Sequence, residues 1–441
     1  MRVVYTPFSK LIHIEGVSCG SDESDANSMK RFQKINRVKF VERWNQELTR
    51  YGSLDDNREI HNHVAKTNRL GRILWVDANT PTPDQDAGSI DTAQHLSRLK
   101  ADGWDVTFAP WDGYRYEGKY TDNLRAIGIR VLCQGHAHTL AAIESLNIDF
   151  DVITLSRAPV AITAHPVLKK LFPQAKIVFN TVDLHYLRYE RELELISSNN
   201  SNSKPKNQPV QKKDELAIMR LADATLVVSD MEKQLLETEL DQRDASRVAV
   251  IPSPRNVHPP TRTFEERVDV GFLGSYQHPP NIDAVDHFLS NIWPRFSARM
   301  PGVRFIIAGS SIPEKFLKLK SDTIRPIGFV EDLEGLMESV RIMVAPLRYG
   351  AGIKGKVISS MCYGIPQVAT RMAAEGMPLT HNVELLIAND DADFVEQMIE
   401  LYTNETLWNR LSTEGMNCVD NTFSSAVVET KLSAVFNALA G

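Results

Sequence analysis

Short apolar runs alternate with longer amphipathic stretches from about residue 72 onward. Such runs are typical of strands buried on both faces, and the stretches between them are typical of helices. Helical patterns fall, for example, at Ser89–Lys100 and Lys213–Leu221. The alternation predicts an α/β protein with parallel sheets covered on both faces. A first series of strands is expected at Ile73–Asp77, Val106–Ala109, Val131–Cys133, Val152–Leu155, Ile177–Asn180, Ala224–Ser229 and Val248–Ile251.

A proline-rich segment, Pro252–Pro260, separates this series from a second one and indicates an interdomain linker. Two open α/β domains joined in this way bind ligands at the carboxyl ends of their strands. The expected domains are residues 71–252 and 253–425, with an N-terminal extension over 1–70 and a C-terminal helix over 426–441 packing back on the core. The second series of strands is expected at Val268–Leu273, Arg304–Ala308, Thr323–Gly328, Ile342–Ala345, Gln367–Ala369 and Leu385–Ala388.

Composition narrows the class of protein further. The chain has 441 residues and a net charge of −6, which argues against a general nucleic-acid binder. The four cysteines form no CxxC pair, which favours free thiols in a reducing compartment: Cys19, Cys133, Cys362 and Cys418. Since neither a secretory signal nor a long apolar run is visible, a cytoplasmic location is expected, with the inner face of the membrane left open.

One glycine-rich segment carries the clearest chemistry. Gly350–Lys356 follows the apolar run Val340–Val344 and leads into a helical pattern, Val357–Gly364, that is closed by glycine. A strand, a glycine turn and a helix start together bind anions, because backbone N–H groups and the helix dipole point at the ligand. Lys354 and Lys356 add positive charge. The segment therefore predicts a site for a phosphorylated ligand.

Several motifs, taken in their order and spacing, resemble the GT-B glycosyltransferases. The resemblance is specifically to the retaining, family-4-like enzymes, also called glycosyl transferases group 1, over about residues 71–440. It rests on Ile73–Asp77 followed by Pro81–Asp84 and Gly88-Ser89, on Thr181–His185, on Met219–Asp223 before Val227–Ser229, on Gly271–Ser275, and on Ala345–Lys356 with Ala373–Met377 after it.

This resemblance implies two Rossmann-like, doubly wound domains facing a cleft, an acceptor domain followed by a donor domain. It implies transfer of a sugar, with retention, from a nucleoside-diphosphate sugar to a saccharide or lipid-linked acceptor in surface polysaccharide or glycoconjugate synthesis. No cofactor or metal is expected, since the nucleotide sugar is itself the donor substrate. No nucleic acid is expected as a partner, while peripheral contact with the membrane or with a partner glycosyltransferase is left open.

The resemblance also assigns candidate site residues. The catalytic candidates are His185, Lys356 and Glu375, and the acceptor-side candidates are Asp86, Arg157 and Asp183. Positive groups at the diphosphate would stabilise the charge that develops on the departing nucleotide. The candidates for binding the donor and its diphosphate are Gly88, Gly274, Ser275, Arg348, Gly350, Gly352, Ile353, Lys354 and Ser359. For Gly88, His185, Arg348, Lys356 and Glu375 a purely structural role stays open.

In one respect the chain departs from the family. A pair of glutamates eight positions apart contacts the donor sugar and the ribose in these enzymes, and the matching positions here are Ala351 and Ser359. A serine can still hydrogen-bond a hydroxyl group, but it carries no charge. Glu375, in the next strand-end loop, is a candidate to supply a carboxylate to the sugar.

Two sequence patterns look like metal-binding motifs, but neither is interpreted as a metal site. Asp84-Gln85-Asp86 spells the DxD motif of metal-dependent GT-A transferases, but it follows the first strand of a GT-B pattern and is interpreted as a turn. Two histidine pairs lack further ligands at suitable spacing and are interpreted as surface residues: His61 with His63, and His136 with His138.

Residues 1–70 resemble a different protein, the C-terminal tail of a family-2-type GT-A glycosyltransferase. The resemblance rests on Val3–Pro7, Leu11–Gly16, Arg31-Phe32 and Arg43-Trp44. This resemblance is compatible with the remnant of a fused two-transferase ancestor or with a chain cut from a longer one, and in both cases His13 and Glu15 are not expected to form a working site alone. The alternative is a helical extension that packs on the GT-B core.

Two competing functions stay open. The missing carboxylates at Ala351 and Ser359 are compatible with a non-catalytic GT-B module that binds a partner transferase or a glycan. A sugar-nucleotide epimerase of the same fold ranks last, because the sequence offers no set of acid/base carboxylates and histidines in the donor pocket.

Overall fold

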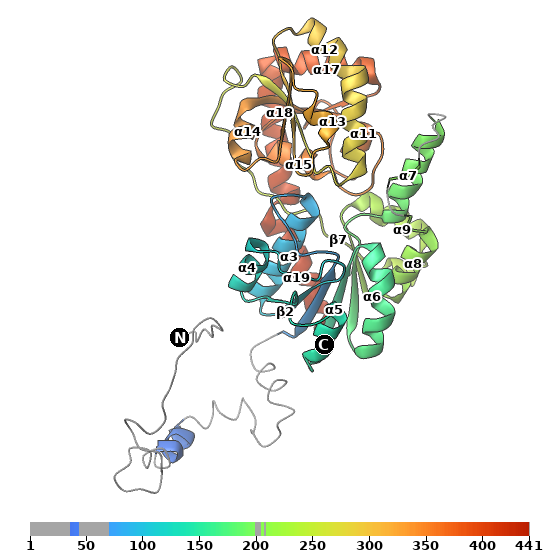
Figure 1. Cartoon of the computed structure of the whole chain (residues 1–441), viewed down its shortest axis with the longest axis vertical. Helices are drawn as coiled ribbons and strands as arrows, with labels where there is room; N and C mark the ends of the chain where they lie inside the picture. The colour runs from blue at the N-terminus through green and yellow to red at the C-terminus, as the bar shows by residue number, and fades with distance from the viewer. Residues whose placement is uncertain (1–35, 44–69, 199–203, 207–208, 441) are drawn as a thin grey trace. The chain divides into compact units, whose positions relative to one another are not determined.

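The computed structural model describes residues 36–43, 70–198, 204–206 and 209–440 (Figure 1). The chain divides into two compact units, Met1–Asn68 and Arg69–Gly441. In the first unit the described part is a helix over 36–43 whose side chains are all exposed. The predictions for His13, Glu15, His61, His63 and Cys19 lie outside the described residues.

The second unit begins with a sheet of seven parallel strands in the order β3-β2-β1-β4-β5-β6-β7. All seven predicted strands are confirmed, with bounds within two residues of the expected ones. They are β1 (Arg72–Asp77), β2 (Asp105–Pro110), β3 (Arg130–Val131), β4 (Val152–Ser156), β5 (Lys176–Asn180), β6 (Ala224–Val227) and β7 (Val248–Val250).

Alternate residues of the central strand β1 enter two different cores. Ile73 and Trp75 pack with α3, α4 and α19, whereas Leu74 and Val76 pack with α5, α6 and α8. Because side chains alternate across a strand, a continuous apolar run needs helices on both faces. These helices are α3 (Ala87–Asp102), α4 (Lys119–Ala126), α5 (Thr139–Ser145), α6 (Ala158–Leu171), α7 (His185–Ser198), α8 (Lys212–Leu221), α9 (Asp230–Glu239) and α10 (Gln242–Ala245).

The second sheet has six parallel strands in the order β10-β9-β8-β11-β12-β13, and it too confirms the predicted series. Its strands are β8 (Asp269–Leu273), β9 (Phe305–Ala308), β10 (Ile324–Gly328), β11 (Val340–Ala345), β12 (Gln367–Thr370) and β13 (Leu386–Ala388). Its helices are α11 (Pro279–His287), the π-helical turn η2 (Phe288–Ile292), α12 (Trp293–Arg299), α13 (Glu314–Leu317), α14 (Leu333–Ser339), α15 (Gly355–Cys362), α16 (Arg371–Ala374), α17 (Asp391–Thr403), α18 (Glu405–Cys418) and the π-helical turn η3 (Val419–Phe423).

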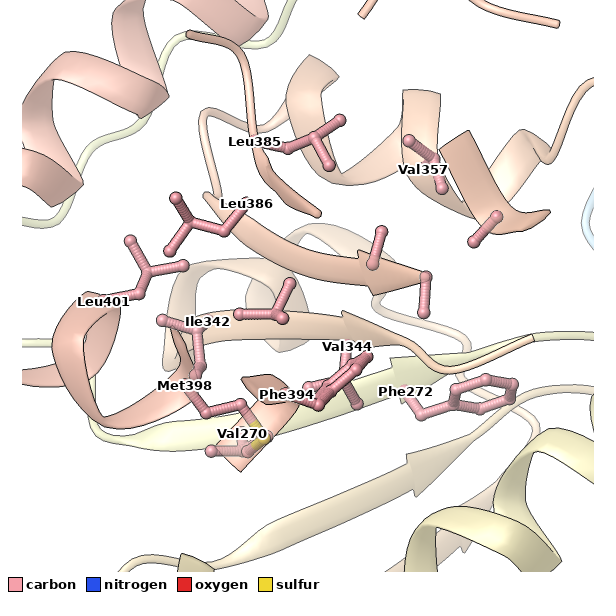
Figure 2. Close-up of a cluster of buried hydrophobic side chains, with 14 of the residues drawn as sticks. Val270, Phe272, Ile342, Val344, Val357, Leu385, Leu386, Phe394, Met398 and Leu401 are labelled. Carbon is pink, nitrogen blue, oxygen red and sulfur yellow. The ribbon is translucent and has the colours of Figure 1, made fainter. Parts of the chain in front are cut away.

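The core of this second domain is apolar and fully enclosed. Figure 2 shows Ile342 and Val344 of β11 beside Phe394 and Met398 of α17, and all four are at most 1% exposed. The strand that leads to the glycine-rich turn is thus fixed by burial, since moving it would uncover large apolar side chains.

The last helix, α19 (Ser425–Leu439), returns to the first sheet. It packs beside α3, and its Phe436 stacks on Trp75 with ring centroids 6.3 Å apart. Arg98 of α3 bonds Ser433 and Glu429 of α19. The chain therefore crosses between the domains twice, once at Pro252–Pro260 and once after η3.

Two further findings concern the described residues as a whole. No helix among them is both long and apolar enough to cross a bilayer. Cys133, Cys362 and Cys418 are free thiols, and the first two are buried.

Candidate functional site

Turns that follow individual strands of the two sheets meet at one place. A Cβ atom on Gly352, after β11, would lie 2.8 Å from Cβ of Asp183, after β5. The Ser310 hydroxyl, after β9, donates a 2.8 Å hydrogen bond to the carbonyl of Gln85, after β1. The carboxyl ends of both sheets therefore contribute to a single site, as expected for paired open α/β domains.

The glycine-rich turn places a helix N-terminus at this site. Gly352 has a φ of 67°, which side chains disfavour, and Asp183 leaves no room for a Cβ atom. Helix α15 then begins at Gly355, and its N-cap residue, Lys354, makes no side-chain capping bond. The first N–H groups of α15 therefore have no capping side chain, and the positive end of the helix dipole faces the turn.

Two lysines lie in this turn. The Lys354 ammonium is buried and donates to the carbonyls of Ala351 (3.3 Å) and Gly352 (2.6 Å). The partly buried Lys356 donates to Oδ1 of Asn281 and lies 5.1 Å from the ring centroid of Phe272. Burial lowers the pKa of Lys354 to about 8 and that of Lys356 to about 7. Within the described residues neither ammonium forms an ion pair.

The first domain contributes two arginines that are paired with carboxylates. Arg157, at the end of β4, donates from Nε to Oδ1 of Asp77 at 2.8 Å, and this neighbour raises the arginine pKa. Arg188 of α7 forms an ion pair with Asp183. Burial alone would raise the pKa of Asp183, but Arg188 and other nearby positive groups hold it well below its usual range. Asp183 is therefore ionised at neutral pH.

His185 begins α7 with its ring turned toward Asp183. Its Nδ1 atom lies 3.1 Å from the Asp183 carbonyl oxygen and 3.2 Å from Oδ1. Burial lowers the pKa of His185 to about 4, so its ring is neutral at pH 7. From the second domain, His278 has its pKa lowered to about 3 by burial and by the charge of Arg188. Each neutral imidazole has one N–H donor and one acceptor nitrogen, so it can form hydrogen bonds without bringing a net charge to the site.

The turn that carries Asp183 is strained. Val182 has a φ of 66°, a conformation that a β-branched residue rarely adopts. Two fully buried glutamates hold it: Glu215 accepts from the N–H groups of His185 (3.2 Å) and Tyr186 (2.8 Å), and Glu232 accepts from Leu184 (3.4 Å). Surrounding structure of this kind is what maintains backbone strain at functional sites.

The turn after β1 carries the acceptor-side candidate Asp86 and the donor-side candidate Gly88, and the contacts of this turn are with neighbouring protein groups. Asp86 caps α3 by accepting from the Ser89 N–H at 2.9 Å, and Asp84 bonds Lys119 at 2.7 Å. The DxD pattern is therefore a capped turn. Gly88 leaves room for Arg157, since a Cβ atom there would lie 3.1 Å from its Nη2 atom.

The histidine pair after β3 also has structural roles. His138 caps α5 by accepting from the Ala141 N–H, and His136 contacts the Ser145 hydroxyl at 3.1 Å. No group of three His, Cys, Asp or Glu side chains suited to a metal ion occurs in the part of the chain that the structure describes.

Glu375 lies at the end of α16 and faces the first domain. Its carboxylate receives two hydrogen bonds from the guanidinium of Arg191 on α7, at 2.6 and 2.8 Å. The same guanidinium donates to the carbonyl of Gly350 at 2.7 Å. The carboxylate of Glu375 is thus beside the glycine-rich turn.

The remaining candidates line the same turn or support it. Arg348 forms a two-bond ion pair with Asp283 of α11, so its charge is compensated. Ile353 packs on the core of the second domain. Ser359 lies on α15 one turn after Lys356, which places the two on the same face of the helix. In the turn that Gly274 begins after β8, the hydroxyl oxygens of Ser275 and Ser310 lie 3.0 Å apart, and Ser275 is the donor because the Ser310 proton goes to the Gln85 carbonyl.

Comparison with known proteins agrees with this arrangement. Residues 267–404 match the family model described as glycosyl transferases group 1. A protein of Klebsiella pneumoniae, described as an uncharacterized 44.6 kDa protein in the cps region, is 25% identical over 169 residues. That alignment covers 36% of this chain and 44%, less than half, of the Klebsiella protein.

Among solved structures, sucrose-phosphate synthase from Thermosynechococcus elongatus superposes with a TM-score of 0.62 at 15% identity, covering 83% of this chain and 98% of that one. HepE from Anabaena, solved with UDP-glucose, superposes with a TM-score of 0.61 at 13% identity, covering 83% of this chain and 100% of that one. The chain has the GT-B fold. The predicted fold class is confirmed, and the group 1 resemblance is confirmed over 267–404.

Within this GT-B frame, several side chains at the site had not been singled out in the sequence. Arg188 and Arg191 follow His185 at helical spacing, and this spacing is a signal that could have found them. His278 and Asn281 follow the second domain's first strand by a few residues, where polar residues are common and carry little signal. Asn281 accepts from Lys356 and the pKa of His278 is lowered in part by the charge of Arg188, and no sequence pattern encodes such contacts between separate elements.

Proposed function

We propose that this protein is a glycosyltransferase that moves a sugar from a nucleoside-diphosphate sugar to a saccharide or lipid-linked acceptor, with retention of configuration, in the synthesis of a surface polysaccharide. The observation that carries the proposal is the pair of lysines at the start of α15. Lys354 and Lys356 bring positive charge to a helix N-terminus, with carbonyl and amide oxygens as partners. A bound diphosphate would supply the negative charge that balances the two ammonium groups.

The chemistry follows from where charge develops. The bond between the anomeric carbon and the diphosphate oxygen breaks, and a bond from the acceptor hydroxyl oxygen to that carbon forms. Negative charge grows on the departing diphosphate, which accepts the acceptor's proton. Lys354, Lys356 and the N–H groups of α15 are already in place, so they stabilise this charge without reorganisation. The first domain, with Asp183 and His185, faces the sugar and the incoming hydroxyl.

The relatives support the donor class and the biological setting. HepE is a GT-B protein whose structure contains UDP-glucose, and the Klebsiella relative is described by its place in a cps region. By analogy we infer a nucleoside-diphosphate hexose or deoxyhexose as donor and polysaccharide synthesis as the setting.

One observation favours a second candidate, a non-catalytic GT-B module. Ala351 and Ser359 replace the two carboxylates that the family resemblance expects at the donor sugar and ribose. Such a module would bind a nucleotide or a glycan and stabilise a partner transferase without turnover. Binding and transfer must therefore be measured separately.

The first experiment is a thermal-shift screen of the full chain against uridine, guanosine, adenosine and thymidine diphosphates and their common sugar conjugates. A ligand that binds only the folded state raises the unfolding temperature. The best donor is then offered to saccharide acceptors, and the product is examined by mass spectrometry and by NMR of its anomeric proton. We expect binding, transfer and a retained anomeric configuration.

Lys356→Ala should reduce nucleotide-sugar affinity at least roughly tenfold, because it removes a charged hydrogen-bond donor. Lys318→Ala is the matched control, since Lys318 is 71% exposed and pairs with the similarly exposed Glu314 at the start of α13. If no nucleotide binds, or if both variants bind like the unmodified protein, the proposal is wrong. Binding without transfer, together with co-purification of a transferase, would favour the non-catalytic module.

A further inference from the structure

The contact between α7 and the end of α16 holds the carboxylate of Glu375 in one orientation. Helix α16 has only four residues, and Glu375 follows it as the C-cap residue. A carboxylate there would ordinarily sample several rotamers, because little backbone structure constrains it. Arg191 instead holds both carboxylate oxygens in a planar, two-bond pairing at 2.6 and 2.8 Å. This geometry fixes the direction of the carboxylate as well as its position.

Arg191 also locates the carboxylate relative to the glycine-rich turn. The nitrogen that bonds Oε2 of Glu375 also donates to the carbonyl of Gly350 at 2.7 Å. Gly350 immediately precedes Ala351, the position at which the family resemblance expects a carboxylate. A single guanidinium therefore brings the carboxylate of Glu375 beside the place left by Ala351.

We propose that Arg191 is a positioning residue that holds Glu375 as the donor-sugar carboxylate, in place of the one missing at Ala351. The proposal rests on the function proposed above and deepens it. Glu375 accepts hydrogen bonds from sugar hydroxyls, while Arg191 balances its charge. The pair is therefore suited to a neutral hexose rather than to a sugar that carries its own carboxylate.

The two members of the pair come from different domains. Arg191 lies on α7, which covers the first sheet, and Glu375 follows β12 and α16 of the second. The carboxylate is thus held in direction only while the two domains are in contact. Binding of the sugar then depends on both domains, whereas the diphosphate binds mainly to Lys354, Lys356 and α15 of the second domain.

A neighbouring contact provides a matched control. Glu192, the next residue on α7, accepts a 3.2 Å hydrogen bond from the hydroxyl of Tyr349. Tyr349→Phe removes this second contact, which joins α7 to the residue just before the glycine-rich turn, and leaves Glu375 untouched. Comparison with this variant distinguishes two effects: a weaker contact between the two domains, and the loss of the oriented Glu375 carboxylate.

The test compares Arg191→Ala, Glu375→Gln and the double variant in calorimetric binding of the nucleoside diphosphate and of the neutral nucleotide sugar, and in steady-state transfer. We expect each single variant to leave diphosphate affinity within about threefold, to weaken nucleotide-sugar binding, and to lower kcat roughly 10- to 100-fold, because a misplaced group costs that much. The double variant should be no worse than either single one, since the two residues act as a unit. Arg191→Lys should recover part of the loss, and Tyr349→Phe should stay within about twofold.

Additive losses in the double variant would overturn the proposal, and so would an equal loss in Tyr349→Phe or a matching loss of diphosphate affinity. The proposal would also be overturned if the preferred donor were a nucleotide sugar whose sugar carries a carboxylate. If the unmodified protein binds the diphosphate and the nucleotide sugar equally and Arg191→Ala changes neither affinity, only this inference fails. If the unmodified protein binds neither ligand, the proposed function fails as well. Thermal unfolding of each variant establishes that it is folded.

Discussion

The two domains bring positive charge to the site in different ways. In the first domain two arginines at the site have carboxylate partners, Arg157 with Asp77 and Arg188 with Asp183. In the second domain Lys354 and Lys356 have only carbonyl and amide oxygens as partners among the described residues. Paired charges fix geometry, whereas unpaired charges stay available to an incoming anion. The comparison indicates that the first domain shapes the site and the second supplies its electrostatic attraction.

The pKa shifts follow the same division. The carboxylate neighbour raises the pKa of Arg157, while burial lowers the pKa of Lys356 to about 7 and that of Lys354 to about 8. A lysine that is partly neutral in the free protein regains its proton when an anion binds. Substitutions of these groups in the two domains should therefore change the free energy of unfolding in opposite directions and by different amounts.

Asp77→Asn should have the largest effect on stability. It leaves the guanidinium of Arg157 without its counter-ion, and breaking a buried pair from one side typically costs 3–5 kcal/mol. Because Arg157 is 31% exposed, we expect a loss of roughly 2–3 kcal/mol in the free energy of unfolding, measured by urea denaturation. Glu396→Gln breaks the exposed pair with Arg299 and should leave the free energy of unfolding nearly unchanged. Equal losses in the two variants would contradict the comparison.

Affinity for the nucleotide sugar should fall as the pH rises above about 7. The diphosphate binds the protonated lysines, and in the free protein Lys356 and Lys354 lose their protons at about pH 7 and 8. Binding must restore those protons, so affinity levels off below about pH 6 and drops by up to roughly 500-fold between pH 7 and 9, about 50-fold from Lys356 and about tenfold from Lys354. Calorimetry in buffers of different ionisation enthalpy should detect proton uptake on binding.

Lys356→Arg is the control for this pH dependence. Arginine keeps its charge over the whole range, so the slope should be shallower in this variant. A profile that is flat in the unmodified protein, or unchanged in the arginine variant, would show that Lys356 does not control the pH dependence.

Lys356→Met should change stability less than Asp77→Asn does, and in the opposite direction. Methionine keeps an apolar chain beside Phe272 and removes an ammonium that lacks a counter-ion. We expect the free protein to gain about 1 kcal/mol in the free energy of unfolding, with loss of nucleotide binding, as is common when a functional charge is removed. A less stable variant would mean that the bond to Asn281 contributes more than the burial of charge costs.

The strands were predictable because burial on both faces imposes a simple pattern. Val340–Ala345 and Arg72–Asp77 are nearly continuous apolar runs, and neighbouring residues of β1 indeed enter opposite cores. The start of α15 was also predictable, since glycines before a helical pattern leave few alternatives. The strands of the two described sheets could therefore be predicted from the period of the sequence pattern alone, without tertiary information.

The partners of the site residues were not predictable in this way. Glu375 was a candidate from its place after a strand, but its pairing with Arg191 joins positions 184 residues apart. Arg348 was a candidate for the diphosphate, yet its guanidinium is paired with Asp283. A sequence pattern specifies the side chain and the element that carries it, whereas the partner depends on how separate elements pack.

The sequence by itself determined the two series of parallel strands and the glycine-rich turn with its lysines, because periodicity and backbone conformation are local properties. The tertiary structure alone decided which charges are compensated and which are not. That distinction depends on distances of a few ångströms between residues from separate helices, strands and turns. It separates Arg157, whose charge Asp77 balances, from Lys356, whose charge is open to a ligand.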